Sequence, residues 1–177
     1  MECGRFESDL AERPSDYEAK MTTVAWRGGY MAADSLSVRG GGIKGTATKI
    51  HRVGDYVIGT AGTLMDCVAF VRWWQDRDRP LDFRAFRNDG SDAPDLHALV
   101  AGPDGVEVWT EHLQPVPVET EFYAIGSGAM AAMAAMYMGA SAAESVRIAS
   151  LVDQYTGGEI QVLEVTSGCG KKLAVAS

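Results

Sequence analysis

The fold is decided by residues 22–34, which read Thr22-Thr23-Val24-Ala25-Trp26-Arg27-Gly28-Gly29-Tyr30-Met31-Ala32-Ala33-Asp34. Strand-like runs lie on both sides of Gly28-Gly29, and a two-residue Gly-Gly link between such runs is a strong signal for a β-hairpin. The stretch therefore predicts two antiparallel strands that begin a sheet and bring Asp34 back to the level of Thr22 and Thr23.

More strands and helices are predicted on either side of a central helix. Apolar residues at helical spacing predict that helix, which Gly62 opens and which contains Leu64 and Trp73. Alternating patterns and turn residues predict strands at 48–52, 56–60, 96–101, 106–110, 122–125 and 160–165, with a glycine-rich loop at 39–45.

The end of the chain is expected to be helical before its last strand. Helices are predicted at 129–138 and 141–154, the second with Ser141 and Glu144 in capping-box spacing, and residues 167–177 are expected to form a loose tail. The order of strands, helix, strands, two helices and strand favours an antiparallel α+β layered fold.

Composition and charge limit the classes of function. The 177 residues are 46% hydrophobic and carry a formal net charge of −8, which is typical of one soluble domain and argues against a nucleic-acid partner. The longest weakly polar stretch, 124–143, contains Ser127, Ser141 and Tyr137, so we expect no membrane span. The three cysteines are an odd number without a close pair, which excludes a disulfide framework and favours a reducing, cytoplasmic location.

The first 21 residues differ in character from the rest. They are rich in Asp and Glu and contain no apolar run, so they are not a secretory signal. They are either a removable leader or an upstream extension, with the true start at Met21. We therefore expect an acidic extension at 1–21 that is absent from the active form, followed by a single domain at 22–177.

Three other patterns do not support a cofactor site. Residues 40–46 resemble a phosphate-binding loop, but Gly45 is followed directly by Thr46 without the required Lys. The three histidines, His51, His97 and His112, lack metal-ligand spacing. A methionine every three residues from Met130 to Met136 indicates a packed helix face. We expect no metal or organic cofactor.

Thr22 is the candidate centre of the chemistry. Removal of Met21 would leave Thr22 with a hydroxyl nucleophile and a free α-amine that can take the hydroxyl proton. The hairpin places Asp34 near Thr22, where it could hold Lys49 of the third predicted strand, and the lysine charge would stabilise the alkoxide.

The sequence resembles the N-terminal-nucleophile (Ntn) threonine peptidases, which include proteasome β-subunits and bacterial and phage proteasome-like peptidases. The resemblance covers roughly residues 22–165. It rests on Thr22-Thr23-Val24, Ala32-Ala33-Asp34, Thr48-Lys49-Ile50, Gly59-Thr60-Ala61-Gly62 followed by Asp66, Ala124-Ile125-Gly126-Ser127-Gly128 and Asp153-Gln154-Tyr155-Thr156-Gly157-Gly158. Each motif is common alone, whereas six in this order are specific.

The resemblance implies an αββα sandwich of two antiparallel sheets flanked by helices, and a role for each matching residue. Thr22 would be the nucleophile, Asp34 and Lys49 the activating pair and the Gly62 N–H the oxyanion donor. Ser127, Asp153 and Thr156 would surround the α-amine. By family position Thr60, Ala61 and Leu64, which are small and apolar, would line the substrate pocket, which predicts apolar side chains before the cleaved bond.

The resemblance also implies partners. Identical subunits would form stacked rings that admit peptides or unfolded chains, and the sequence leaves open whether a separate ATP-driven unfolding partner exists. Two alternatives stay open: an Ntn amidase for a small amide, and a catalytically silent ring scaffold. Taken singly, Asp34 and Lys49 could form a surface ion pair, and ordinary turn or helix-end roles are favoured for Ser127, Asp153 and Thr156. As an ordered set around Thr22, these residues favour the functional interpretation.

Overall fold

The computed structural model describes residues 22–39, 42–76 and 94–165. The predicted extension at 1–21 and the predicted tail at 167–177 lie outside the described residues. The elements follow in the order β1 (Thr23–Arg27), β2 (Tyr30–Ala33), β3 (Leu36–Arg39), β4 (Ile43–Thr46), β5 (Ile50–Val53), β6 (Tyr56–Gly62), α1 (Leu64–Gln75), β7 (Leu96–Gly102), β8 (Gly105–Trp109), β9 (Pro115–Pro117), β10 (Phe122–Gly126), α2 (Ala129–Tyr137), α3 (Ala142–Ala149) and β11 (Gln161–Glu164).

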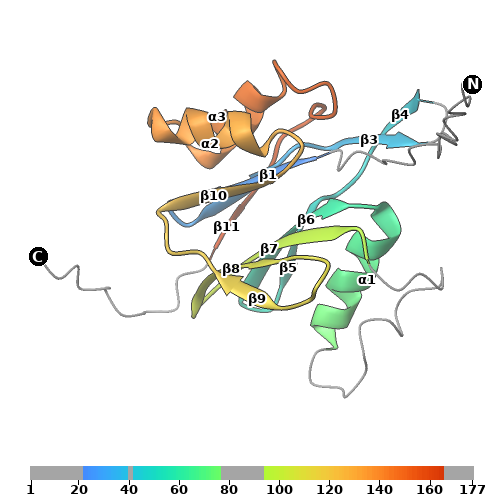
Figure 1. Cartoon of the computed structure of the whole chain (residues 1–177), viewed down its shortest axis with the longest axis vertical. Helices are drawn as coiled ribbons and strands as arrows, with labels where there is room; N and C mark the ends of the chain where they lie inside the picture. The colour runs from blue at the N-terminus through green and yellow to red at the C-terminus, as the bar shows by residue number, and fades with distance from the viewer. Residues whose placement is uncertain (1–21, 40–41, 77–93, 166–177) are drawn as a thin grey trace, which may run out of the picture.

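These elements form four layers (Figure 1). A sheet in the order β10-β1-β2-β11 lies beneath α2 and α3, and a sheet in the order β5-β6-β7-β8-β9 lies between it and α1. All neighbouring strands pair antiparallel. The described part of the chain therefore has the predicted α+β architecture, an αββα sandwich.

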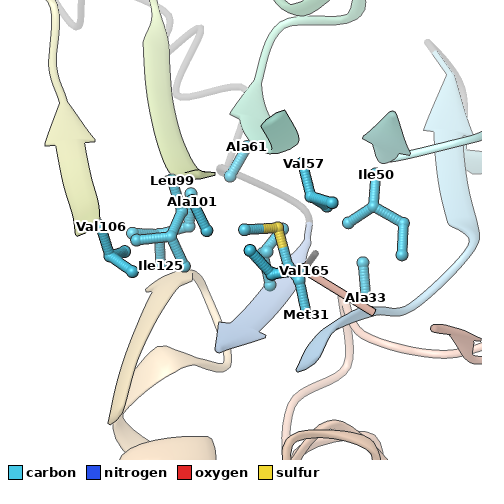
Figure 2. Packing of buried hydrophobic residues seen from close by; sticks show 11 residues of the cluster. Met31, Ala33, Ile50, Val57, Ala61, Leu99, Ala101, Val106, Ile125 and Val165 are labelled. Atoms are coloured by element: carbon cyan, nitrogen blue, oxygen red, sulfur yellow. The ribbon is translucent and has the colours of Figure 1, made fainter. Parts of the chain in front are cut away.

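Three apolar clusters hold the layers together. Between the sheets, Met31 of one sheet packs in one cluster with Val57 and Leu99 of the other (Figure 2), and Val24 belongs to the same cluster. Aromatic and aliphatic side chains pack between α1 and its sheet, and alanines are the majority of the buried residues beneath α2 and α3. The aromatic cluster includes Phe70, Trp74 and Trp109, and the alanine-rich cluster includes Ala25, Ala32, Ala132 and Ala149.

The predicted first hairpin is present and sets the position of the site. Gly28 and Gly29 have φ angles of 59° and 82°, a left-handed geometry that glycine adopts without a Cβ penalty. Val24 pairs with Ala33. The Asp34 N–H donates to the Thr23 carbonyl at 3.2 Å, so Asp34 lies beside Thr23 at the open end of the hairpin.

Three strands, β3, β4 and β9, were not predicted from the sequence. The glycine-rich loop expected at 39–45 is wrong at residues 39 and 43–45, because β3 and β4 pair there as a separate hairpin, while residues 40–41 lie outside the described residues. Every residue of β4 is exposed, so the strand has no buried face and no alternating hydrophobic pattern to reveal it. The short strand β9 was not predicted. It contains Pro115 and Pro117, which lack an N–H donor, and it is an edge strand, where proline is tolerated.

The last helix is shorter than predicted. The capping box of Ser141 and Glu144 starts α3 as expected, but the helix ends at Ala149 instead of continuing to residue 154. The Asp153 N–H donates to the Ala149 carbonyl at 2.8 Å as the chain turns away. Neither Gly nor Pro stands at this stop, so the sequence carries no local signal for it.

Candidate active site

Thr22 lies at the entry to β1 in the interior of the sandwich. It is buried, and the following residue, Thr23, pairs with Gly126 of β10. A Cβ at Gly126 would lie 2.0 Å from the Thr22 carbonyl oxygen and 3.5 Å from the Ala61 Cβ. Glycine at position 126 therefore lets two strands and the first threonine approach closely.

A buried ion pair forms one side of the site. Lys49 Nζ lies 2.9 Å from Asp34 Oδ1 and 3.0 Å from Oδ2, with side-chain exposures of 7% and 1%. The Asp34 carboxylate also accepts backbone N–H groups from Thr23 at 2.8 Å, Leu36 at 3.1 Å and Gly157 at 3.0 Å. These donors compensate the buried negative charge, and this ion pair lies in the interior rather than on the surface.

Residues of β6 and β11 hold the backbone around Lys49 by hydrogen bonds. Its N–H donates to Gln161 Oε1 at 3.0 Å, its carbonyl accepts from the Thr60 N–H at 2.9 Å, and Gln161 Nε2 donates to the Ala47 carbonyl at 3.0 Å. Burial lowers the pKa of the Lys49 ammonium from its ordinary value of 10.5, although Asp34 favours the charged form. Lys49 is thus a rigidly placed cation whose proton is held less tightly than usual.

A chain of hydroxyl groups forms the other side. Ser127 Oγ donates to Asp153 Oδ2 at 2.6 Å, and the Thr156 hydroxyl donates to the same oxygen at 2.5 Å. The Thr22 nitrogen donates to Ser127 Oγ at 3.4 Å, a long contact. The Thr23 and Thr156 hydroxyls lie 2.6 Å apart. Ser127, Asp153 and Thr156 therefore come together around the start of β1.

Gly62 is the last residue of β6, and α1 begins two residues later at Leu64. Its φ is 136°, and a Cβ there would lie 2.0 Å from the Asp95 carbonyl oxygen. That oxygen accepts the Thr63 N–H at 3.0 Å, while the Asp95 N–H donates to the buried Asp66 carboxylate at 2.8 Å. The same carboxylate accepts the Thr63 hydroxyl at 2.9 Å, so the peptide planes that follow Gly62 are fixed from both sides.

The three expected pocket residues differ in exposure. Thr60 and Ala61 are buried in β6, whereas Leu64 is 52% exposed on α1. Thr60 forms a hydrogen bond with the Cys67 thiol. Burial raises the pKa of this thiol to about 12. Ala61 lies near Thr22 through Gly126, and Leu64 is the member of the set that faces solvent.

Four further residues contribute to the site, although the sequence did not predict a role for them. Thr23 donates to Asp34 through its backbone and contacts Thr156 through its side chain. Gln161 and Gly157 hold Lys49 and Asp34 from positions more than a hundred residues away. At Gly128 a Cβ would lie 2.1 Å from the Thr23 hydroxyl oxygen. Thr23, Gly128 and Gly157 stand in motifs that carry the resemblance, whereas Gln161 had no signal in the sequence.

Other potential sites offer little chemistry. Among the described residues, no group of three or more His, Cys, Asp or Glu is arranged to hold a metal ion. A hollow of about 80 Å³ lined by Tyr56, Trp74 and Glu107 includes none of the predicted site residues. Over the same parts of the chain, no helix combines the length and apolar character needed to cross a membrane.

Comparison with solved structures identifies the fold. The chain is similar to Thiobacillus denitrificans BPH in complex with epoxomicin, with a TM-score of 0.63, 23% identity, and 82% of this chain and 98% of that chain covered. A second BPH structure gives a TM-score of 0.61, 24% identity and the same coverage. Eukaryotic HslV from Trypanosoma brucei gives 0.60 and 22%, with 81% and 98% covered.

These neighbours are HslV-like and proteasome-like threonine peptidases, so the fold expected from the resemblance is confirmed. A scan of protein-family profiles found no match, and a comparison with curated proteins found none either. The chain thus has the fold of a proteasome-like Ntn hydrolase.

Proposed function

We propose that the chain is a threonine-type endopeptidase whose nucleophile is the Thr22 hydroxyl and whose general base is the Thr22 α-amine. One observation carries the proposal: a buried Asp34–Lys49 pair and the Ser127–Asp153–Thr156 cluster meet the backbone of residues 22 and 23 from two sides. The likeness to threonine peptidases of the same fold supports it.

The chemistry follows from the groups at hand. The α-amine takes the Thr22 hydroxyl proton as the oxygen attacks the scissile carbonyl, while the Lys49 charge favours the alkoxide. The Gly62 N–H stabilises the oxyanion. The protonated amine then gives its proton to the leaving amine, and water hydrolyses the acyl ester with the amine again as base.

The site requires a free amine at Thr22. In the chain as written, the Thr22 nitrogen is in a peptide bond with Met21, and an amide nitrogen cannot accept the proton. We therefore propose that residues 1–21 are absent from the active form and that 22–177 is the catalytic domain. Ser127 and Asp153 would then position the amine.

The assembly is part of the proposal. In this proposal identical subunits stack as rings in the cytoplasm and admit peptides or unfolded chains, and the existence of an ATP-driven unfolding partner stays open. Thr60, Ala61 and Leu64 would contribute to the substrate pocket. Analytical ultracentrifugation of the matured chain should give a large, uniform particle, and a monomer at micromolar concentration would contradict this part.

Replacement of the nucleophile tests the activity. Thr22→Ala, in a chain processed to residue 22, should abolish hydrolysis of a fluorogenic peptide while the far-ultraviolet circular dichroism and particle size stay unchanged. Thr48→Ala, at an exposed threonine, is the matched control and should keep wild-type rates. Substantial turnover by Thr22→Ala would exclude Thr22 as nucleophile.

Epoxomicin offers a second probe, because one structural neighbour is a complex with it. We expect epoxomicin to raise the melting temperature of the matured chain and to have no effect on Thr22→Ala. A panel of peptides and small amides, assayed in parallel, would separate an endopeptidase from an amidase with the same nucleophile.

A further inference from the structure

Thr23 is in contact with both halves of the site. Its N–H donates to Asp34 Oδ1 at 2.8 Å, and its carbonyl accepts the Asp34 N–H at 3.2 Å. Its side chain points the other way and lies 2.6 Å from the Thr156 hydroxyl oxygen. The residue is fully buried, so each of these contacts is made without competition from water.

Which threonine donates in the Thr23–Thr156 contact follows from Asp153, the residue that accepts the Thr156 hydroxyl proton. The Asp153 carboxylate can only accept, so Ser127 and Thr156 must both donate to Oδ2. The single proton of Thr156 is thereby used. In the short contact between the two threonines, Thr23 must then be the donor and Thr156 the acceptor.

The space around this hydroxyl is shaped to keep it in place. A Cβ at Gly128 would lie 2.1 Å from Thr23 Oγ1 and 2.9 Å from Thr156 Oγ1. Any larger residue at position 128 would push the two hydroxyls apart. The N-terminus of α2 is therefore packed directly against the Thr23–Thr156 contact.

From these contacts we infer that Thr23 is a positioning residue: its hydroxyl orients Thr156, and through Asp153 and Ser127 it sets the environment of the Thr22 nitrogen. The inference rests on the proposed function for its catalytic meaning. The order of donation is Thr23 to Thr156 to Asp153 on one side, and Thr22 nitrogen to Ser127 to Asp153 on the other.

Removal of the Thr23 hydroxyl has a defined electrostatic consequence. Donation from Thr23 polarises the Thr156 hydroxyl and strengthens its bond to Asp153. Without it, more negative charge stays on Asp153, which favours the protonated form of the nearby Thr22 amine. The amine then holds its proton to higher pH and is a poorer base at neutral pH.

The test compares Thr23→Val with Thr23→Ser in the full assembly processed to Thr22. The apparent pKa of the Thr22 α-amine is measured from the pH dependence of its acetylation, with the N-terminal peptide quantified by mass spectrometry. Thr23→Val should raise this pKa by about half a unit or more, since one charge-assisted contact is weakened, and Thr23→Ser should restore the wild-type value. The acid limb of kcat/KM should move in the same direction.

The outcomes separate this inference from the proposed function. If the wild-type chain with free Thr22 hydrolyses no peptide, the proposed function fails, but the acetylation readout still tests Thr23. If Thr23→Val does not fold, Thr23→Ala removes the same hydroxyl without adding a methyl group and should shift the amine pKa in the same direction. A folded Thr23→Val or Thr23→Ala whose amine pKa and acid limb match the wild type would overturn the inference.

Discussion

The two carboxylates of the site, Asp34 and Asp153, are held in different ways. Asp34 is 1% exposed and accepts hydrogen bonds from three backbone N–H groups. Both of its carboxylate oxygens also accept hydrogen bonds from Lys49 Nζ. Asp153 is half-buried and is satisfied largely by side-chain hydroxyls, those of Ser127 and Thr156. Backbone N–H groups hold the carboxylate of Asp34, whereas side-chain hydroxyls hold that of Asp153. These hydroxyls can be removed one at a time by substitution.

This difference predicts two kinds of variant. Changes at the Asp34–Lys49 pair should cost both stability and activity, because the backbone of three segments converges on Asp34 and a buried charge would lose its partner. A change at Ser127 of the hydroxyl cluster should cost activity with little effect on folding, because Ser127 is exposed, whereas Thr156 is buried.

Loss of the cation should have the largest effect. Lys49→Ala leaves the Asp34 carboxylate buried without its counter-ion, so peptide hydrolysis should fall by about a thousandfold or more and the free energy of unfolding by about 3–5 kcal/mol. Lys49→Arg should not rescue fully, because a planar guanidinium does not replace a compact ammonium. Activity is measured with a fluorogenic peptide and stability by urea denaturation.

A matched pair of controls separates the two losses. Lys44→Ala, at an exposed lysine of β4, should change neither quantity. The double variant Asp34→Asn with Lys49→Met removes both charges together and should recover part of the stability but none of the activity. Wild-type rates in Lys49→Arg would mean that Lys49 acts only as a distant charge.

A smaller effect is expected on the hydroxyl side. Ser127→Ala removes the group between the Thr22 nitrogen and Asp153, so kcat/KM should fall by about tenfold to hundredfold through the loss of one or two hydrogen bonds. The melting temperature should change little. Ser150→Ala removes a comparable hydroxyl that donates to the Arg147 carbonyl and is the control. A large loss of stability in Ser127→Ala would contradict the contrast between the two clusters.

The pH dependence should show the smallest, but most distinctive, effect. Because burial lowers the Lys49 pKa, activity that needs the ammonium should decline as pH rises through a value below 10.5. In the window between the folded pKa and 10.5, the unfolded chain holds a proton that the folded chain has released, so Lys49's contribution to folding stability rises with pH.

Opposite trends in rate and stability over one alkaline window would therefore identify Lys49. The rate profile and urea-denaturation series should be measured on the same preparation, with Lys44→Ala retaining both trends. An alkaline limb that appears only above 10.5 would contradict a lowered pKa.

Most of the fold was predictable because local patterns determine it. Gly28-Gly29 fixes the first hairpin, and Ser141 with Glu144 fixes the start of α3. The exposed β4 and the proline-containing β9 were missed because neither has a buried, alternating face. The end of α3 was missed because no glycine or proline marks it; after Ala149 the chain continues in turn hydrogen bonds, such as that from the Asp153 N–H to the Ala149 carbonyl.

The candidate site was predictable only in part, for a similar reason. Asp34 could be placed beside Thr22 from hairpin geometry, and Lys49 from its strand. Gln161 and Gly157 hydrogen-bond this region across 112 and 123 positions of the chain, and no sequence spacing encodes such contacts. The inferred donation from Thr23 to Thr156 rests on the Thr156–Asp153 hydrogen bond and on the acceptor role of the Asp153 carboxylate, and the spacing in the sequence does not encode these contacts.

One measurement tests the central claim that a free Thr22 amine is the catalytic base. A chain that begins at Met21 and the full 177-residue chain are expressed in parallel, each N-terminus is determined by intact mass, and peptide hydrolysis is measured on both. We expect the shorter chain to lose Met21, expose Thr22 and be at least as active as the longer one, with activity tracking the fraction of molecules that begin at Thr22. Full activity from molecules shown to retain residues 1–21 would contradict the account, because their Thr22 nitrogen is an amide and cannot accept a proton.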